Sequence, residues 1–260
     1  MTATRLFQMK IFPLYSVQSL ITGGREYQEV IDMSMPFYVA PEQLMEDRAD
    51  YARKGIARGR SLIGLTYEEG ILIVAENASN TLRKVSEIYD RIAFAGVGKY
   101  NEFDQLRIAG VRHADLKGYS FSREDVDARS LANQYAQMLG QIFTHEMKPM
   151  EVEILVAEIG LSEDPASSQL FHILYDGTVK DHSDYAVLGG DAEVIFERFA
   201  DSYTENLTLA SGIESAINAL AGPDRVLEPD DLEVAELSHV NGRRSFRRIE
   251  GEELSGLMPS

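Results

Sequence analysis

The order of the strand-like and helix-like segments constrains the fold of this chain more than any single motif. Two apolar segments rich in Ile, Leu and Val, residues 61–67 and 70–76, flank a Glu68-Glu69 turn and are predicted to pair as a hairpin. The other predicted elements are a strand at about 88–96, helices at 99–120 and 125–144, strands at 152–160, 169–175 and 185–189, helices at 192–200 and 207–220, and strands at 232–238 and 244–249. Because helices and strands come in groups and do not alternate, the sequence predicts an α+β fold of stacked layers.

A further helix is predicted at residues 41–58, ahead of the first strand. Pro41 suits the first helical position, and the apolar residues recur at helical spacing on one stripe: Met45, Ala49, Ala52 and Ile56. The stripe is narrow and made largely of alanine. We therefore expect this helix to pack on a neighbouring molecule as well as on its own domain.

Charge and cysteine content exclude several classes of function. The formal net charge is -17 and there is no cysteine. Such acidity argues against nucleic acid or an anionic membrane surface as a partner. Without cysteine the chain has no disulfide, thiolate metal site or Cys nucleophile, which fits the cytoplasm. We expect no cofactor and no metal site.

Residues 1–32 differ in character from the segment that comes after them. Arg5 and Lys10 precede an apolar stretch, but Pro13 and polar residues interrupt that stretch, and no small-residue cleavage site is present beyond it. A secretory signal is therefore disfavoured. We expect residues 1–32 to be a disordered extension or to precede the native start, which would then be Met33.

Three short patterns suggest catalysis, and each fails a requirement of its motif. The segment 96–99 lacks the first glycine and the final Ser or Thr of a phosphate loop, and His145-Glu146 is followed by Pro149 where a zinc protease has histidine. The polar cluster 181–184 contains triad residue types but is more simply a loop. The arginines Arg243, Arg244, Arg247 and Arg248 are expected to pair with acidic neighbours within or between subunits.

Several longer segments are similar to segments of a known family. They are residues 33–43, residues 50–59 with a Tyr-Ala pair, Val74 to Asn77, residues 84–91, residues 98–104, residues 130–137 and Phe246 to Ile249. Together they resemble the α-type subunits of the proteasome core particle, specifically the actinobacterial branch. The resemblance covers roughly residues 33–257.

This resemblance implies a fold, an assembly and a role. It implies a four-layer α-β-β-α sandwich of the N-terminal-nucleophile hydrolase type, and one domain at 33–260 with an α-specific helix at 41–59. The implied partners are proteasome β subunits, neighbouring α subunits in a seven-membered ring, a ring-shaped regulatory ATPase and protein substrates in transit. Within the cytoplasm, such a subunit gates entry to the barrel and docks the ATPase for protein degradation.

The resemblance also separates a scaffold from a catalyst. In the family, β subunits cut peptides with an N-terminal threonine whose own α-amine assists proton transfer. Here the equivalent strand begins at Ser61 behind a whole helix, and neither the glycine nor the threonine of the processing site is present. Glu76 and Lys84 occupy places similar to the acidic and lysine partners of β active sites. We expect no catalytic residue.

Two sites are implied instead. The family uses a lysine at the position of Lys84 to bind the terminal carboxylate of an activator's tail. The alternative for Lys84 is a salt bridge to Glu76 or Glu87. A short uncharged segment is expected to close the pore as a gate, and otherwise to be a floppy terminus: Met33, Ser34, Met35, Pro36, Phe37, Tyr38 and Val39.

Two other classes of function compete with this interpretation. The chain could be a catalytic N-terminal-nucleophile hydrolase subunit of the same fold. Maturation would then remove everything before Ser61. It could also be a stand-alone binding module.

Overall fold

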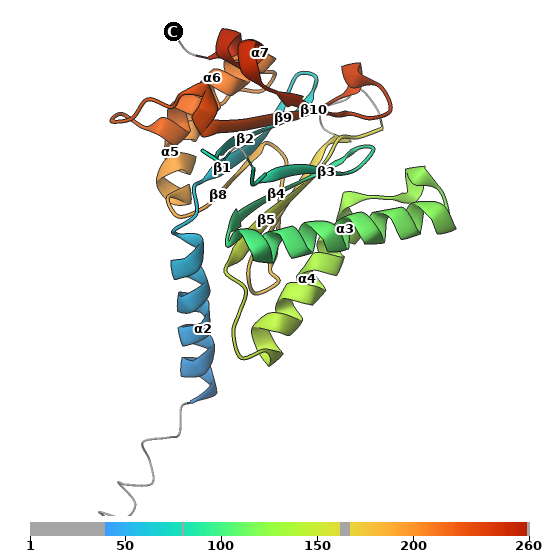
Figure 1. Ribbon diagram of the computed structural model, residues 1–260, viewed down its shortest axis with the longest axis vertical. Coiled ribbons are helices and arrows are strands. Elements are labelled where there is room, and N and C mark those ends of the chain that lie inside the picture. Colours follow the sequence, from blue (N-terminus) through green and yellow to red (C-terminus); the bar gives the residue numbers. More distant parts are fainter. Residues whose placement is uncertain (1–39, 80, 162–166, 259–260) are drawn as a thin grey trace, which may run out of the picture. The chain divides into compact units, whose positions relative to one another are not determined.

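The computed structural model of the chain describes residues 40–79, 81–161 and 167–258 (Figure 1). The predicted extension and the predicted gate segment lie outside the described residues. The chain divides into two compact units between Leu44 and Met45, and helix α2 (Pro41–Ile56) begins in the first unit. The second unit, Met45–Ser260, contains both sheets and the helices that cover them.

Ten strands form two antiparallel sheets among the described residues. The first sheet has the order β10-β9-β2-β1-β8, with bounds Phe246–Ile249, Leu232–Ser238, Gly70–Glu76, Leu62–Tyr67 and Tyr185–Leu188. The second has the order β3-β4-β5-β6-β7, with bounds Val85–Tyr89, Ile92–Gly98, Val152–Glu158, Gln169–Ile173 and Val179–His182. The 61–76 hairpin is confirmed, because β1 and β2 pair from Leu62 with Ala75 to Tyr67 with Gly70.

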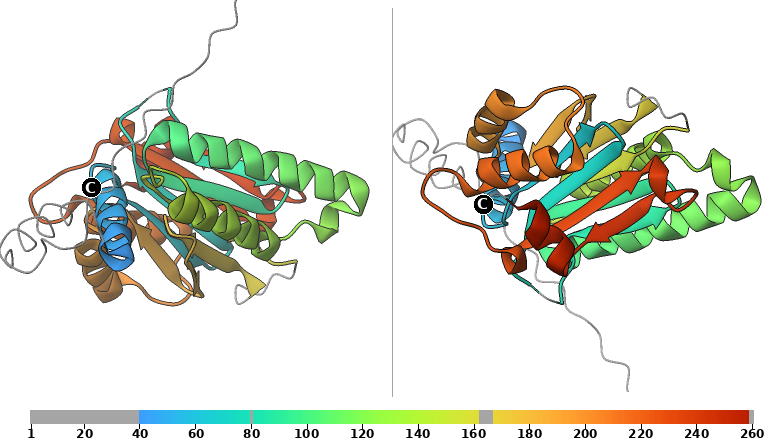
Figure 2. Two further views of the ribbon diagram at one scale, coloured as in Figure 1. Left: turned by 90° about the horizontal axis from the view of Figure 1, so that it is seen from below. Right: turned by 90° about the horizontal axis from the view of Figure 1, so that it is seen from above.

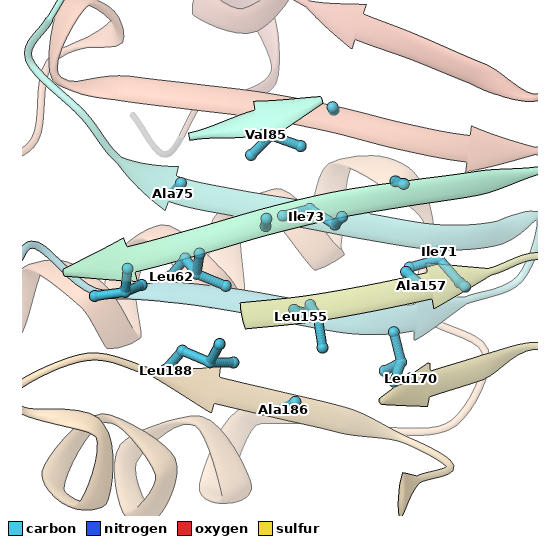
Figure 3. Packing of buried hydrophobic residues seen from close by; sticks show 14 of the residues in the cluster. Leu62, Ile71, Ile73, Ala75, Val85, Leu155, Ala157, Leu170, Ala186 and Leu188 are labelled. Atoms are coloured by element: carbon cyan, nitrogen blue, oxygen red, sulfur yellow. The ribbon is translucent and has the colours of Figure 1, made fainter. Parts of the chain in front are cut away.

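The two sheets pack face to face through an apolar layer (Figure 3). Leu62 and Ile73 of the first sheet meet Leu155 and Leu170 of the second, and all four are almost completely buried. Every residue of β1 and β2 is buried, because helices cover the other face of the same sheet. This is why these strands read as continuous apolar runs rather than as alternating patterns.

Helices cover the two outer faces (Figures 1 and 2). Helices α5 (Ala192–Ser202), α6 (Leu209–Ala221) and α7 (Gly251–Leu257) pack on the first sheet, and α3 (Tyr100–Ser120) and α4 (Ala128–His145) pack on the second. The fold is therefore the expected four-layer α-β-β-α sandwich.

The part of α2 in this unit is fastened to the second sheet and to the end of α4. Ala52 and Ile56 enter the layer between the sheets. Arg48 donates to the carbonyls of Ile142 and Glu146, which end α4. Tyr51 stays about half exposed (48%). That this helix also packs on a neighbouring molecule stays a prediction.

One predicted strand is in fact a hairpin. The sequence predicts a single strand near 88–96, but the chain turns at Asp90 and Arg91 between β3 and β4. Neither turn residue is the glycine or asparagine that marks a tight hairpin. Tertiary ion pairs hold the turn instead: Asp90 with Arg123 at 2.5 Å and Arg91 with Glu158 at 2.8 Å.

Helix α4 begins three residues later than the predicted helix at 125–144. Ser122 caps a 3₁₀ turn by accepting from the backbone of Glu124. Helix α4 begins at Ala128, and its N-cap residue Asp127 accepts from the backbone of Ser130 at 2.7 Å. Lys117 also holds Asp127, at 2.6 Å. This ion pair between α3 and the cap residue stabilises the later start.

Two elements fall where no regular structure is predicted. Strand β7 includes Asp181 and His182 of the polar cluster and pairs with β6 at the sheet edge, where polar side chains are common. Helix α7 comes after the last strand. Within the described ranges, no helix is long and apolar enough to cross a membrane.

Candidate functional site

A polar pocket of about 540 Å³ lies where the connection from α2 to β1 meets the end of β2 and the loop after α6. Its charged lining is Arg58, Arg60, Arg198, Arg225, Glu76, Asp191 and Asp224. Four arginines against three carboxylates leave a small positive excess, although the whole chain carries -17. The pocket is thus a local exception to the acidity of the chain.

Lys84, the residue just before β3, bonds to two of the residues that line this pocket, Arg60 and Glu76. Its ammonium group donates to the main-chain carbonyl of Arg60 and, at 3.1 Å, to that of Glu76. An ammonium group carries three N–H donors, so these two bonds leave one for an incoming acceptor. The lysine is therefore held in place without being saturated.

Burial shapes the ionisation of this lysine. It lowers the pKa of Lys84 to about 8, Glu76 and Glu233 act in the opposite direction, and Arg60 adds to the lowering. An incoming carboxylate would favour the charged ammonium and raise this pKa. The side chain is consequently charged in most molecules at neutral pH, yet it titrates close to that range.

Glu76 is neutralised by arginines and not by the ammonium group of Lys84. Arg225 binds its carboxylate with both guanidinium nitrogens, at 2.9 and 3.2 Å, and Arg60 lies 3.1 Å away. Glu87, the other proposed partner of Lys84, pairs with Arg244 at 2.5 Å. The salt bridges considered as the alternative for Lys84 are therefore taken by arginines, and the lysine itself bonds to carbonyls.

Ser61, Glu76 and Lys84 come together at the start of β1, as the resemblance implies. Ser61 is buried, and its carbonyl accepts from the backbone of Glu76 at 3.0 Å. The carbonyl of Arg60 belongs to the peptide bond that precedes Ser61, and it accepts from Lys84. As long as this peptide bond is uncut, Ser61 has no free α-amine to act as a base.

The other motif-like segments are structural. Gly98 ends β4 with φ +103°, and a Cβ there would come within 2.0 Å of the Glu151 carbonyl, so the segment 96–99 is a tight strand-to-helix turn. No group of three metal-ligating side chains forms within the described ranges. The expected intrachain pairing of arginines is confirmed for Arg244, Arg247 and Arg248.

Two residues of the site carry no signal that the sequence makes visible. Arg225 lies in the loop after α6, with no motif around it, and reaches Glu76 only because the fold brings residues 149 positions apart together. Glu233 is one of many acids in the sequence, and only its burial and its contacts with the backbone of Lys84 and Val85 distinguish it. Arg248 stands out in the sequence, but only as part of an arginine run.

Comparison with known proteins finds a matching family and several similar proteins. The family described as "Proteasome subunit" matches residues 56–236. A protein named "Proteasome subunit alpha" from Acidimicrobium ferrooxidans is 66% identical over 222 residues, covering 85% of this chain and 95% of its own length. Proteins of the same name from Xylanimonas cellulosilytica (53% identical, 86% of this chain and 95% of theirs) and Kineococcus radiotolerans (52%, 87% and 98%) are similar.

Proposed function

Because this chain belongs to the proteasome subunit family and resembles its actinobacterial α subunits over most of its length, we propose that it is a non-catalytic α-ring subunit of the proteasome core particle. In this role it associates with β subunits and with copies of itself in a seven-membered ring in the cytoplasm. It gates substrate entry and docks a ring-shaped regulatory ATPase for protein degradation. The observation that supports docking most directly is the partly buried Lys84 ammonium group with a donor to spare.

A terminal carboxylate is the chemistry that suits Lys84. The ammonium group is partly desolvated, its acidic neighbour Glu76 is taken by two arginines, and both of its carbonyl partners are neutral. A carboxylate placed against the third N–H would form a charge-assisted hydrogen bond. Arg60, whose charge also acts on Lys84, lies close enough to add to its attraction.

Docking is expected to weaken as the pH rises through about 8. Below this value Lys84 is charged and can pair with the carboxylate, whose own pKa is far lower; above it the free lysine loses its proton and must regain one to bind. The measurement is the affinity of assembled rings for a short peptide copied from the C-terminus of the organism's own ring ATPase, followed across this pH range. Affinity that stays constant up to about pH 10, the ordinary range of lysine, contradicts the prediction. The control is Lys84→Arg, whose guanidinium stays charged and should remove the pH dependence.

The chain without β subunits is expected to hydrolyse no peptide. In the full-length chain Ser61 is buried and joined to Arg60, so it lacks the amine that activates an N-terminal nucleophile. A fluorogenic peptide assay on the purified chain measures this. Hydrolysis that Ser61→Ala abolishes would establish the competing interpretation, a catalytic subunit, and intact mass would then show loss of everything before Ser61.

Exposed apolar side chains support assembly with other subunits. Leu116, Tyr119 and Phe121, at the end of α3 and just beyond it, are 68%, 91% and 77% exposed. Large apolar side chains clustered on a surface are typical of protein–protein contact sites. A stand-alone binding module would leave them in water.

The test of the proposed function is co-expression with the β subunit of the same organism. We expect the two chains to elute together as a particle of very high mass with peptidase activity that depends on the β subunit. A chain that stays separate from β, or a small complex, would favour the stand-alone module. Gel filtration or native mass spectrometry together with the peptide assay distinguishes these outcomes.

A further inference from the structure

Glu233 is a buried carboxylate next to Lys84, and four hydrogen-bond donors surround it. It lies on β9 and is 3% exposed. Its oxygens accept from the guanidinium of Arg248 at 2.6 Å, the side chain of Asn77 at 2.9 Å, and the backbone N–H groups of Lys84 at 2.8 Å and Val85 at 3.3 Å. A buried carboxylate keeps its charge only where it is paired with an opposite charge and hydrogen-bonded. Here two of the hydrogen bonds come from consecutive backbone N–H groups, those of Lys84 and Val85.

The segment so held is the one that carries Lys84. Glu233 belongs to the first sheet and Val85 begins β3 of the second, so the carboxylate joins the two sheets at the residue before β3. Arg248 completes the arrangement by donating to the Val85 carbonyl at 2.5 Å. The main chain is therefore fixed at Lys84 and at the residue after it.

We propose that Glu233, with Arg248, is a positioning residue for the docking function of Lys84: it fixes the main chain of Lys84 so that the ammonium group is presented to an incoming terminal carboxylate. This inference rests on the proposed function of Lys84. Lysine has a long flexible stem, and ordering it on binding costs conformational entropy. A lysine whose backbone and ammonium group are both already held loses less on binding, which is the advantage of preorganisation.

Glu233 also acts on Lys84 through its charge. The charged groups facing the ammonium group are Glu76 from β2, Glu233 from β9 and Arg60 from the segment before β1, and the two acids favour its charged form. Removing the charge of Glu233 should therefore lower the pKa of Lys84 further. A purely structural residue would have no such effect on the pH dependence of docking.

The test is Glu233→Gln in assembled core particles. Glutamine keeps the shape, but its amide presents N–H groups where the carboxylate accepted from two backbone N–H groups and a guanidinium. We expect binding of the free-carboxylate peptide from the C-terminus of the organism's own ring ATPase to weaken roughly tenfold at neutral pH. We also expect the pH at which binding is lost to move lower. The same peptide with an amidated C-terminus should bind both particles equally weakly.

The matched control is Glu236→Gln. Glu236 lies on the same strand, is equally buried at 3% and is paired with an arginine, Arg247, at 2.9 Å. Its other partners are the Tyr67 hydroxyl and the Asn241 side chain, which lie away from Lys84. This variant should lose thermal stability as Glu233→Gln does, yet bind the peptide with unchanged affinity and pH dependence.

A second variant decides the matter if Glu233→Gln particles do not assemble. Arg248→Lys keeps a positive charge beside Glu233. It loses the planar guanidinium group, whose two nitrogens bind the Glu233 carboxylate and the Val85 carbonyl at the same time. It should weaken binding while leaving the pH of loss unchanged.

Two results have separate meanings. Suppose first that Lys84→Ala abolishes binding of the peptide. The positioning role is then overturned if Glu233→Gln particles keep normal affinity and an unchanged pH profile. If only Arg248→Lys particles assemble, normal affinity in them overturns it instead. Normal affinity in Lys84→Ala particles would instead overturn the docking function, and the positioning role with it.

Discussion

Replacing Lys84 with alanine is expected to remove most of the stimulation of the assembled core by its ring ATPase. The substitution deletes the ammonium group that would bind the terminal carboxylate of the activator. A hydrogen bond to a charged group contributes about 1.5–3 kcal/mol when partly desolvated, which corresponds to a loss of roughly tenfold to 150-fold per site. Several pockets around one ring act together, so the losses multiply through avidity.

The measurement must separate docking from stability. Lys84 also satisfies the carbonyls of Arg60 and Glu76, so its removal costs some thermal stability in any case. Affinity for the activator should therefore be measured per intact particle, with thermal midpoint and elution volume from the same preparation. Normal affinity in intact Lys84→Ala particles, with reduced stability alone, would make Lys84 a fold residue and end the docking assignment.

Arg83→Ala is the matched control for this experiment. Arg83 is the neighbouring cation in the same segment, but its side chain pairs with Glu250 at 2.9 Å, whereas Lys84 bonds to the carbonyls of Arg60 and Glu76. The substitution removes the same formal charge from the surface without touching the proposed carboxylate site. Activator affinity should stay within the range of the unaltered particle.

Deleting the chain up to Ala40 is expected to raise small-peptide hydrolysis by the assembled core several-fold in the absence of activator. The deletion removes the proposed gate, Met33 to Val39, and spares α2, which begins at Pro41. In the intact chain the Ala40 carbonyl accepts from the backbone of Leu44 at 3.0 Å, and an initiating methionine before Pro41 supplies an equivalent carbonyl. Turnover of a fluorogenic peptide per assembled particle is the readout.

A shorter deletion isolates the gate from the extension. Removing residues 1–32 leaves Met33 to Val39 in place, so hydrolysis should stay low. If the two deletions behave alike, the segment Met33 to Val39 is not the gate. Unchanged turnover after the longer deletion, with assembly intact, leads to the same conclusion.

The fold could be predicted from the sequence to a large extent because its strands and helices are locally encoded. The runs at 61–67 and 70–76, the helix begun by Pro41 and the strand 232–238 reappear in the structure with nearly the same bounds. The apolar composition of the first two runs already requires burial on both faces. Layers of helices on either side of paired sheets supply that burial.

The errors of prediction lie where distant residues decide local structure. The hairpin turn at Asp90 and Arg91 lacks the glycine that follows aspartate in a tight-hairpin signal, and ion pairs with Arg123 and Glu158 stabilise it. The start of α4 is stabilised by Lys117, which pairs with the cap residue Asp127. Both contacts join elements that are adjacent only after folding.

For the candidate site, the sequence by itself determined the absence of a maturable nucleophile and the position of Lys84. These are matters of which residues are present and in what order. Only the tertiary structure decided the surroundings of that lysine: the arginines that neutralise Glu76, the carbonyls that hold the ammonium group, and Glu233 beneath it. The physical reason is that the ionisation of a side chain depends on burial and on charges a few ångströms away. Arg225 reaches Glu76 only when α6 packs on the first sheet, and Glu233 reaches Lys84 only when the two sheets pack on each other.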